Sequence, residues 1–280
     1  MALNLEAVGQ RSEALIHEYG WKDVVLYALG VGARRDGELD YLFEDRGPKV
    51  LPTYAVVPSF AAIHALLPVI GGDLLGVVHG DQAIRQHRPF APEGRLVTRA
   101  RVAGIYDLKR LAICNLETES HDEDGALICE TEWGIIFRND GGFGGPRPPK
   151  AARNRPPARE PDFRVEEATS TEQALLYRLS GDLNPLHADP AIGEKVGFGQ
   201  PILHGLCTYG YVGRVLLREL CAGDPSRLVS LSGQFRKPVF PGDRLIVEGW
   251  IEGRTVFVSC ARAEKPEEPV FSAGLAELAE

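Results

Sequence analysis

A carboxylate and an imidazole lie five residues apart in the segment Asp182-Leu-Asn184-Pro185-Leu-His187. On an α-helix this spacing would place Asp182 and His187 about 140° apart around the axis. Pro185 disfavours helix for the residue before it, so we predict a turn-rich loop over 181–190 that folds the two side chains toward each other. Such a pair can hold one water and exchange protons with it. The alternative is a turn that caps the next helix, with His187 an ordinary buried histidine.

A second segment, Pro201-Ile-Leu-His204-Gly205, leads into an apolar stretch over 206–220 that we predict to be a helix. Gly205 then lies at the helix start, where backbone N–H groups have no partner within the helix and the helix dipole is positive. Glycine also lets the carbonyl oxygen of a ligand approach the backbone closely. Gly205 is therefore a candidate donor to an oxygen that gains negative charge, although glycine near a helix start is common.

The two halves of the chain repeat one order of elements. The segment RPFAPEGRL at 88–96 resembles KPVFPGDRL at 237–245, and alternating, strand-like residues follow each of them. A stretch that we predict to be helical precedes each, at 59–70 and at 206–220. This order predicts an α+β protein built from two copies of one unit. Chance similarity between two short turns rich in proline and glycine is the alternative.

A segment rich in glycine, proline and arginine separates the halves. Residues 139–161 contain almost nothing that could enter a core, so we predict a surface linker between an N-terminal unit (1–138) and a C-terminal unit (162–280). Its cations either keep the linker solvated or approach a ligand that carries phosphate: Arg147, Lys150, Arg153, Arg155 and Arg159.

The composition of the 280 residues excludes several classes of protein. With 44% hydrophobic and 25% charged residues the chain can build a soluble core, and a net charge of −8 argues against nucleic-acid binding. We expect neither a membrane span nor an export signal. The cysteines include no C-x-x-C pair, so we predict buried, reduced thiols rather than a zinc site or disulfides: Cys114, Cys129, Cys207, Cys221 and Cys260.

Taken together, the motifs resemble the type 2 enoyl-CoA hydratases of the MaoC-like dehydratase family. The segments YRLSGDLNPLHADP and GFGQPILHGLCTYG carry the resemblance, and VVLYALGVGA, LPTYAVVPSF, VVHGDQ, GGFGG and QFRKPVFPGD follow the family's order along nearly the whole chain. The resemblance implies a double hot dog fold, in which a curved antiparallel sheet wraps each of two long helices. It also implies a hydro-lyase of fatty-acid metabolism that converts trans-2-enoyl-CoA reversibly to (3R)-3-hydroxyacyl-CoA.

The same resemblance implies roles for individual residues. Asp182 and His187 would be the catalytic pair, Asn184 would shape their water site, and Gly205 would donate its N–H to the thioester oxygen. The positions that would contact the acyl-CoA are His79, Gly80, Lys109, which Arg110 could replace, and Phe235. Because D-x-N-P-x-H occurs only in the second half, we expect one active site per chain, with the N-terminal unit accommodating the acyl tail.

Cofactor and partners follow from the same resemblance. No metal or redox cofactor is expected, since the thioester already acidifies the α-carbon. An acyl-CoA is the expected substrate, with no nucleic acid or membrane as partner, and the family's habit implies a homodimer. The chain ends in GLAELAE rather than an S-K-L type signal, so we expect a cytoplasmic protein. Acyl preference would depend on packing around 53–65 and 74–80.

Four alternative functions compete with this interpretation of the sequence. Gly30 and Gly32 follow an apolar run, but Arg35 stands where a dinucleotide fingerprint needs its third glycine. A zinc hydrolase built on His187, Asp189 and His204 lacks H-E-x-x-H spacing. The stronger alternatives are a dehydratase that acts on acyl-carrier-protein thioesters and a hot dog protein that binds acyl-CoA without turnover.

Overall fold

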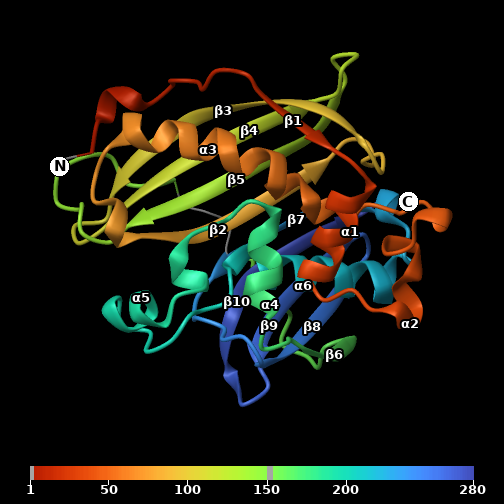
Figure 1. Ribbon diagram of the computed structural model, residues 1–280. Helices are drawn as coiled ribbons and strands as arrows, with labels where there is room; N and C mark the ends of the chain where they lie inside the picture. Colours follow the sequence, from red (N-terminus) through yellow and green to blue (C-terminus); the bar gives the residue numbers. More distant parts are fainter. Residues whose placement is uncertain (1–2, 150–153) are drawn as a thin grey trace.

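The computed structural model describes residues 3–149 and 154–280, and within them ten strands form one antiparallel sheet (Figure 1). The strand order is β1-β3-β4-β5-β2-β7-β10-β9-β8-β6. The N-terminal half supplies β1 (Leu15–Tyr19), β2 (Val77–Gln86), β3 (Gly94–Asp107), β4 (Ala112–His121) and β5 (Leu127–Phe137). The C-terminal half supplies β6 (Phe163–Ala168), β7 (Leu228–Phe235), β8 (Arg244–Glu252), β9 (Thr255–Arg262) and β10 (Lys265–Leu278).

The strand order itself contains the internal repeat. Outward from the centre the N-terminal strands run β2-β5-β4-β3-β1, and the C-terminal strands run β7-β10-β9-β8-β6 in the matching sequence order. The two central strands, β2 and β7, pair antiparallel, with Ala83 opposite Ser232. The similar segments 88–96 and 237–245 connect β2 to β3 and β7 to β8, which are equivalent places. The predicted two-copy α+β architecture is confirmed.

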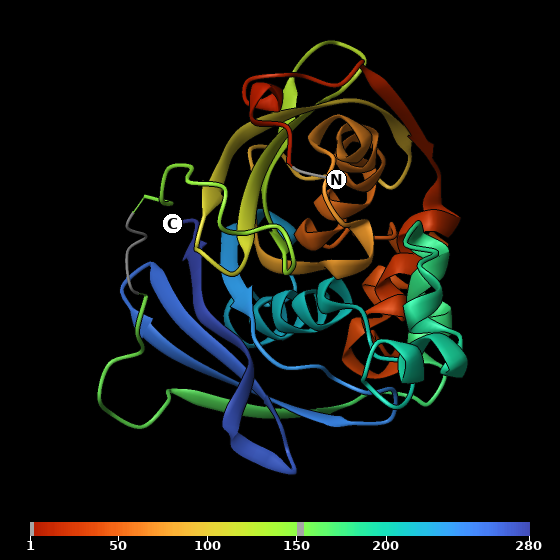
Figure 2. The same cartoon turned by 90° about the vertical axis from the view of Figure 1, so that its left-hand side faces the viewer.

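The two longest helices lie within the curve of the sheet (Figure 2). The described helices are α1 (Trp21–Gly30), α2 (Arg35–Glu38), α3 (Val56–Ile70), α4 (Gln173–Tyr177), α5 (Pro190–Lys195) and α6 (Gly205–Leu220). Figure 2 shows the N-terminal strands curling around α3 and the C-terminal strands curling around α6. The long helices begin within three residues of the predicted positions, and the arrangement is a double hot dog.

Helix α3 is apolar on nearly all its faces. With the turn before it, the segment Pro52–Ile70 spans 19 residues at a mean hydropathy of 1.7, which is long and apolar enough to cross a membrane by composition alone. In the structure it is the central helix of the N-terminal half and packs against β3 and β4. Its Ala62, Ile63 and Leu66 are buried in the core. Packing against the sheet therefore accounts for this face, whereas Ala61, Ala65 and Pro68 are exposed.

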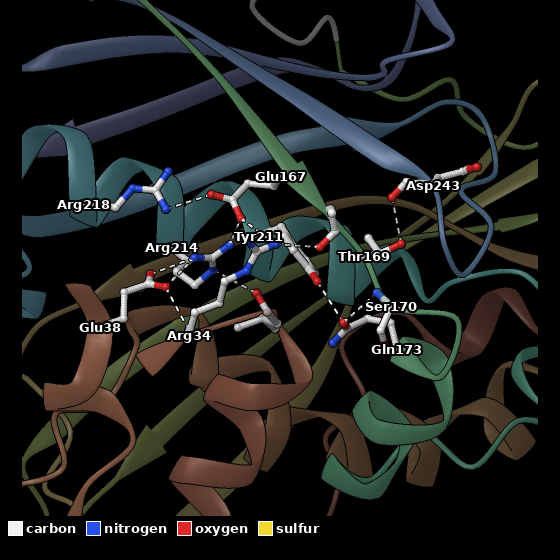
Figure 3. A network of polar contacts seen from close by, with 12 residues as sticks. Arg34, Glu38, Glu167, Thr169, Ser170, Gln173, Tyr211, Arg214, Arg218 and Asp243 are labelled. Atoms are coloured by element: carbon white, nitrogen blue, oxygen red, sulfur yellow. Dashed lines mark hydrogen bonds and ion pairs between the residues drawn. The ribbon is translucent and has the colours of Figure 1, made fainter. Parts of the chain in front are cut away.

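Helix α6 differs because it carries a buried cation. Arg214, 1% exposed, donates from Nη1 to both carboxylate oxygens of Glu38, at 2.8 and 2.7 Å, and from Nη2 to Glu167 (Figure 3). Arg218 donates to the other oxygen of Glu167 at 2.8 Å. Burial alone would raise the pKa of Glu167, but the two arginines hold it below its usual value. Because Glu38 belongs to α2 and Glu167 to β6, this network joins the two halves around α6.

Within 138–149 and 154–162, the described residues between β5 and β6 form no helix or strand, as expected of a linker. The start of the segment is nonetheless anchored. The Asp107 carboxylate accepts the N–H groups of Gly142 and Gly144 at 2.9 and 2.7 Å, and Phe143 packs against the core. Phe143 is therefore one linker residue that does contribute to the core.

The linker cations are only partly described. Arg159 pairs with Asp162 at 2.8 Å and with Glu252 at 3.4 Å. Lys150 and Arg153 lie outside the described residues. The predicted burial of the cysteines is confirmed, because all five are buried, and none forms a disulfide.

Candidate active site

The segment between α4 and α5 is a tight loop with two 3₁₀ turns, Arg178–Ser180 and Pro185–His187. Asp182 Oδ1 accepts the N–H of Asn184 at 3.1 Å, and Asn184 Oδ1 accepts the N–H of Leu186 at 3.0 Å. These local side-chain bonds replace the backbone bonds that a helix would make. Together with Pro185 they fold the chain back on itself, as the sequence predicts for 181–190.

The loop brings the predicted acid–base pair together. Asp182 Oδ2 and His187 Nε2 are 3.9 Å apart, which is too far for a direct hydrogen bond. A water at ordinary hydrogen-bond distance (about 2.8 Å) from both atoms would meet them at an angle of roughly 90°, close to the geometry of a water that donates twice. The pair therefore has the spacing of a site for one shared water.

The protonation of His187 follows from its other contact. Its Nδ1 lies 2.8 Å from the backbone carbonyl of Ile202, which can only accept, so Nδ1 carries the hydrogen and Nε2 keeps a lone pair. Burial lowers the pKa of His187, and the opposing charge of Asp182 offsets this only in part. His187 is therefore a neutral base whose lone pair faces the Asp182 carboxylate.

Gly205 is the first residue of α6, as predicted, and follows the N-cap residue His204. The N–H groups of a first turn have no acceptor within the helix, and the helix dipole adds a partial positive charge there. A Cβ on Gly205 would lie 3.3 Å from the ring of Phe235, so glycine suits the close packing at this position. Gly205 and Phe235 both line the cavity that contains the acid–base pair.

The cavity has a volume of about 440 Å³ and is lined from both halves of the chain. The C-terminal half contributes the pair, Asn184, Gly205 and Phe235. The N-terminal half contributes an apolar wall from α3, β2 and β5: Phe60, Ile63, Leu67, Val77, Trp133 and Ile135. The N-terminal half also contributes His64, His79 and Arg138, and the C-terminal half also contributes apolar residues such as Ile202 and Val239. The ranges 53–65 and 74–80 both reach the lining, whereas the β5 residues were not predicted.

His79 and Gly80 were both predicted to contact the substrate, but of these two β2 residues only His79 lines the cavity. His79 lines the cavity, stacks on Trp133 at a centroid distance of 4.9 Å and an angle of 3°, and lies 5.0 Å from Phe235. Burial lowers the pKa of His79 to about 4, so its ring is neutral. Gly80 is buried at a bulge, does not reach the lining, and packs where a Cβ would meet Ile136 at 2.6 Å. Close packing against Ile136 therefore explains why glycine stands at position 80.

Lys109 is not brought to the cavity. It is exposed in the connection between β3 and β4, with a φ of 70°, and its N–H donates to Asp107 at 2.7 Å. Arg110 is exposed beside it and does not line the cavity either. The Lys and Arg residues that do line the cavity are the exposed residues Arg138, Arg236 and Lys237, which no sequence motif predicts.

The structure also decides two rejected alternatives. The apolar run before Gly32 is helix α1 and not the strand that a dinucleotide fingerprint needs. Asp189 accepts the N–H of Ala191 at 2.9 Å as the cap of α5 and is not part of a cluster with the two histidines.

The carboxylate near His187 and His204 is that of Asp182, and not that of Asp189 as a zinc hydrolase site would require. Ligand atoms of Asp182, His187 and His204 lie within 4.8 Å of one another. The two imidazole rings are stacked at 24° with their centroids 3.6 Å apart, so their lone pairs lie in two separate, nearly parallel planes, whereas the ligand directions of tetrahedral zinc converge on one point.

Comparison with known proteins places both halves in one family. Residues 17–139 match the MFE-2 hydratase 2 N-terminal domain, and residues 152–267 match the MaoC like domain. Among solved structures, a MaoC-like dehydratase from Phytophthora capsici superposes with a TM-score of 0.88 at 29% identity, over 99% of this chain and 98% of the other.

Two relatives are similar over most of their length. The 3-hydroxyacyl-thioester dehydratase Y of Mycobacterium tuberculosis is 41% identical over 92% of this chain and 91% of its own. The peroxisomal enoyl-CoA hydratase 2 of Arabidopsis thaliana is 38% identical over 86% and 84%. With its two matched domains, its fold and these relatives, the chain belongs to the type 2 enoyl-CoA hydratases of the MaoC-like dehydratase family.

Proposed function

We propose that the protein adds water reversibly to trans-2-enoyl-CoA thioesters of fatty-acid metabolism and forms (3R)-3-hydroxyacyl-CoA. One observation carries the proposal. A neutral His187 and the Asp182 carboxylate are 3.9 Å apart at the wall of an apolar cavity, beside the unpaired start of α6. The family supports a hydro-lyase, and the geometry supports one water held by two acceptors.

The proposed chemistry begins with that water. Because Asp182 Oδ2 and His187 Nε2 both accept, the water donates one hydrogen to each, and an oxygen lone pair is left for the β-carbon of the enoyl group. As the C–O bond forms, one of the two acceptors takes a proton from the water. The pair then returns one proton to the α-carbon, so that it ends in its original protonation state.

Charge that leaves the double bond collects on the thioester oxygen as an enolate. The N–H of Gly205 is the proposed donor to this oxygen, and a single oriented donor of this kind contributes about 3 kcal/mol to the transition state. The apolar wall from α3, β2 and β5 would hold the acyl chain. The exposed cations Arg138, Arg236 and Lys237 supply local positive charge for the phosphates of CoA, despite the net charge of −8.

Substitution of the pair tests the proposal. Asp182→Asn and His187→Ala should each lower turnover of trans-2-enoyl-CoA by about 100-fold or more, measured by absorbance of the conjugated thioester. Asp189→Asn is the matched control, because it changes a carboxylate of the same loop to another good N-cap residue outside the cavity. Near-normal hydration by either folded variant of the pair would contradict the assignment.

The thioester carrier and the product configuration need separate measurements. A chain-length series of CoA thioesters with chiral analysis of the product should give the (3R) isomer. The relative named a 3-hydroxyacyl-thioester dehydratase favours one alternative, the same chemistry in reverse on acyl-carrier-protein thioesters. Faster turnover on carrier-protein thioesters than on CoA thioesters would support that alternative. Binding of acyl-CoA without any turnover would support the non-catalytic alternative.

A homodimer and a cytoplasmic location complete the proposal. The family resemblance supports the dimer, and light scattering on the purified protein should give twice the chain mass of 30.6 kDa. Fractionation of cells of the source organism tests the location.

A further inference from the structure

His204 makes contacts that the proposed mechanism does not use. It is 1% exposed, and its ring lies flat against the ring of His187 at a centroid distance of 3.6 Å. Its Nε2 lies 3.2 Å from the backbone carbonyl of Asp182, so Nε2 carries the hydrogen and donates it. One side chain therefore contacts both members of the acid–base pair.

We propose that His204 is a positioning residue for the hydration reaction. Its ring covers one face of His187 and fixes the plane in which the Nε2 lone pair points, while its hydrogen bond to Asp182 keeps this ring in place. The inference rests on the proposed function, because it assigns His204 to the same reaction.

One nitrogen of His204 has no hydrogen-bond partner among the described residues, which suggests that histidine is present at this position for function rather than for stability. With the hydrogen on Nε2, Nδ1 of His204 is an acceptor, and this atom is buried without a hydrogen-bond partner among the described residues. A buried acceptor without a donor destabilises a fold, and such atoms in native proteins call for an explanation. A phenylalanine would fill a similar space without this cost. Packing alone therefore does not account for His204.

The surroundings keep His204 neutral. The titratable and charged groups around the two stacked rings are Asp182 from the same loop, Arg178 from the turn before it and Tyr177 from α4. Burial, followed by the neighbouring His187, lowers the pKa of His204 to about 2. A neutral ring can remain stacked on His187 while His187 exchanges a proton, whereas a second cation would repel it.

The start of α6 does not depend on the His204 side chain. The residue is the N-cap, but its side chain makes no capping hydrogen bond. Its backbone carbonyl accepts the N–H groups of Cys207 and Thr208 at 3.1 and 3.2 Å. Substitutions at 204 therefore leave these backbone bonds available, and the helix that presents Gly205 can form in each variant.

Two substitutions separate the ring face from the hydrogen bond. His204→Phe keeps a flat ring beside His187 without the donor, and His204→Asn keeps a polar group and a good N-cap residue without the face. We expect His204→Asn to lower kcat by about 10-fold or more and to raise the acid limb of the kcat/KM profile toward pH 6.5, because water reaches His187. His204→Phe should lower kcat less and leave the acid limb unchanged. KM should stay within about threefold in both.

A second background shows whether His204 acts through His187. In His187→Ala protein, adding His204→Asn should cost less than about twofold further, since the supported ring is gone. Equal losses in both backgrounds, or an unshifted acid limb in the folded His204→Asn variant, would overturn the inference and leave a structural role only. Thermal unfolding of each variant reports folding. The wild-type assay separates the two failures, because absence of hydration by wild-type protein contradicts the proposed function itself.

Discussion

Helices α3 and α6 occupy equivalent places in the two halves, yet their sequences differ sharply. Helix α3 has no acidic or basic residue apart from His64, and one of its faces lines the cavity. Helix α6 begins with Gly205, which also lines the cavity, and it carries the buried Arg214. Under the proposed function, the acid–base pair and the oxyanion donor all come from the C-terminal copy of the repeat. A duplicated fold can specialise in this way because the two halves share one cavity.

The segments that precede the two helices differ in the same way. Before α6 the chain forms the Asp182–His187 loop, in which polar side chains satisfy local N–H groups. Before α3 it forms the turn Pro52–Ala55, all of whose residues are buried. Tyr54 of this turn packs edge to face against Tyr27 and Phe90. Aromatic packing therefore holds the start of α3, whereas hydrogen bonding shapes the approach to α6.

The largest expected effect is on stability, at the buried Arg214 that distinguishes α6 from α3. Arg214→Met should lower the free energy of unfolding in urea by about 3–5 kcal/mol, because Glu38 and half of the Glu167 pairing would stay buried without their cation. Arg218→Met is the matched control. It pairs with the same Glu167 but is 35% exposed, so we expect a loss of about 1 kcal/mol or less. Equal losses would show that burial of Arg214 is not what matters.

The next effect concerns the start of α6. Gly205→Pro removes one N–H, and His204 already has the extended conformation (φ −59°, ψ 136°) that a following proline accepts. Turnover should fall by about 100-fold to 1000-fold. Gly205→Ala keeps the N–H and adds only a Cβ beside Phe235, so its loss should be clearly smaller. Equal hydration by the folded proline and alanine variants would remove Gly205 as the oxyanion donor.

Acid should destabilise both halves, because burial lowers the pKa of histidines in each, and the lowering is large for His79 and His204. His79 and His204 have pKa values of about 4 and about 2 when folded, against 6.5 when unfolded. Between these limits the unfolded chain binds more protons, so the free energy of unfolding falls as the pH falls. From pH 6.5 to pH 5 each histidine should account for about 2 kcal/mol. In the His79→Phe variant, the free energy of unfolding in urea should therefore decrease by about 2 kcal/mol less between pH 6.5 and pH 5 than in the wild-type protein. An unchanged pH dependence would mean that His79 is charged when folded.

The smallest effect is expected at the wall. Phe60→Ala enlarges the acyl end of the cavity, and each added methylene in such a pocket contributes about 1–3 kcal/mol of discrimination. The ratio of kcat/KM for a longer to a shorter enoyl-CoA should therefore rise by about 10-fold, with kcat on the shorter substrate nearly kept. Phe43→Ala, at an exposed phenylalanine outside the cavity, should leave the ratio unchanged. A proportional loss on all chain lengths would place Phe60 in the chemistry.

Local rules were sufficient for much of the fold. Apolar stretches located α3 and α6 to within three residues, and two similar turns revealed the repeat. A proline between Asp182 and His187 was sufficient to predict that the loop brings them together, because it excludes the helix that would separate them.

What the sequence did not reveal depends on how distant elements meet. Trp133 reaches the cavity because β5 curls around α3, and the alternation of a strand does not say which face encloses a helix. Gly80 lies in a segment that matches the family, but in the structure it lies at a β-bulge and packs closely against Ile136. His204 was present in a quoted motif, but no spacing rule predicts that its ring stacks on His187.

The hydrogen bonds between β2 and β7 make the two halves one continuous sheet. A hinge motion that separated the two halves would have to break these hydrogen bonds. The two halves therefore keep their relative positions around the cavity. Under the proposed function, the acyl chain would therefore enter and leave the cavity without separation of the two halves.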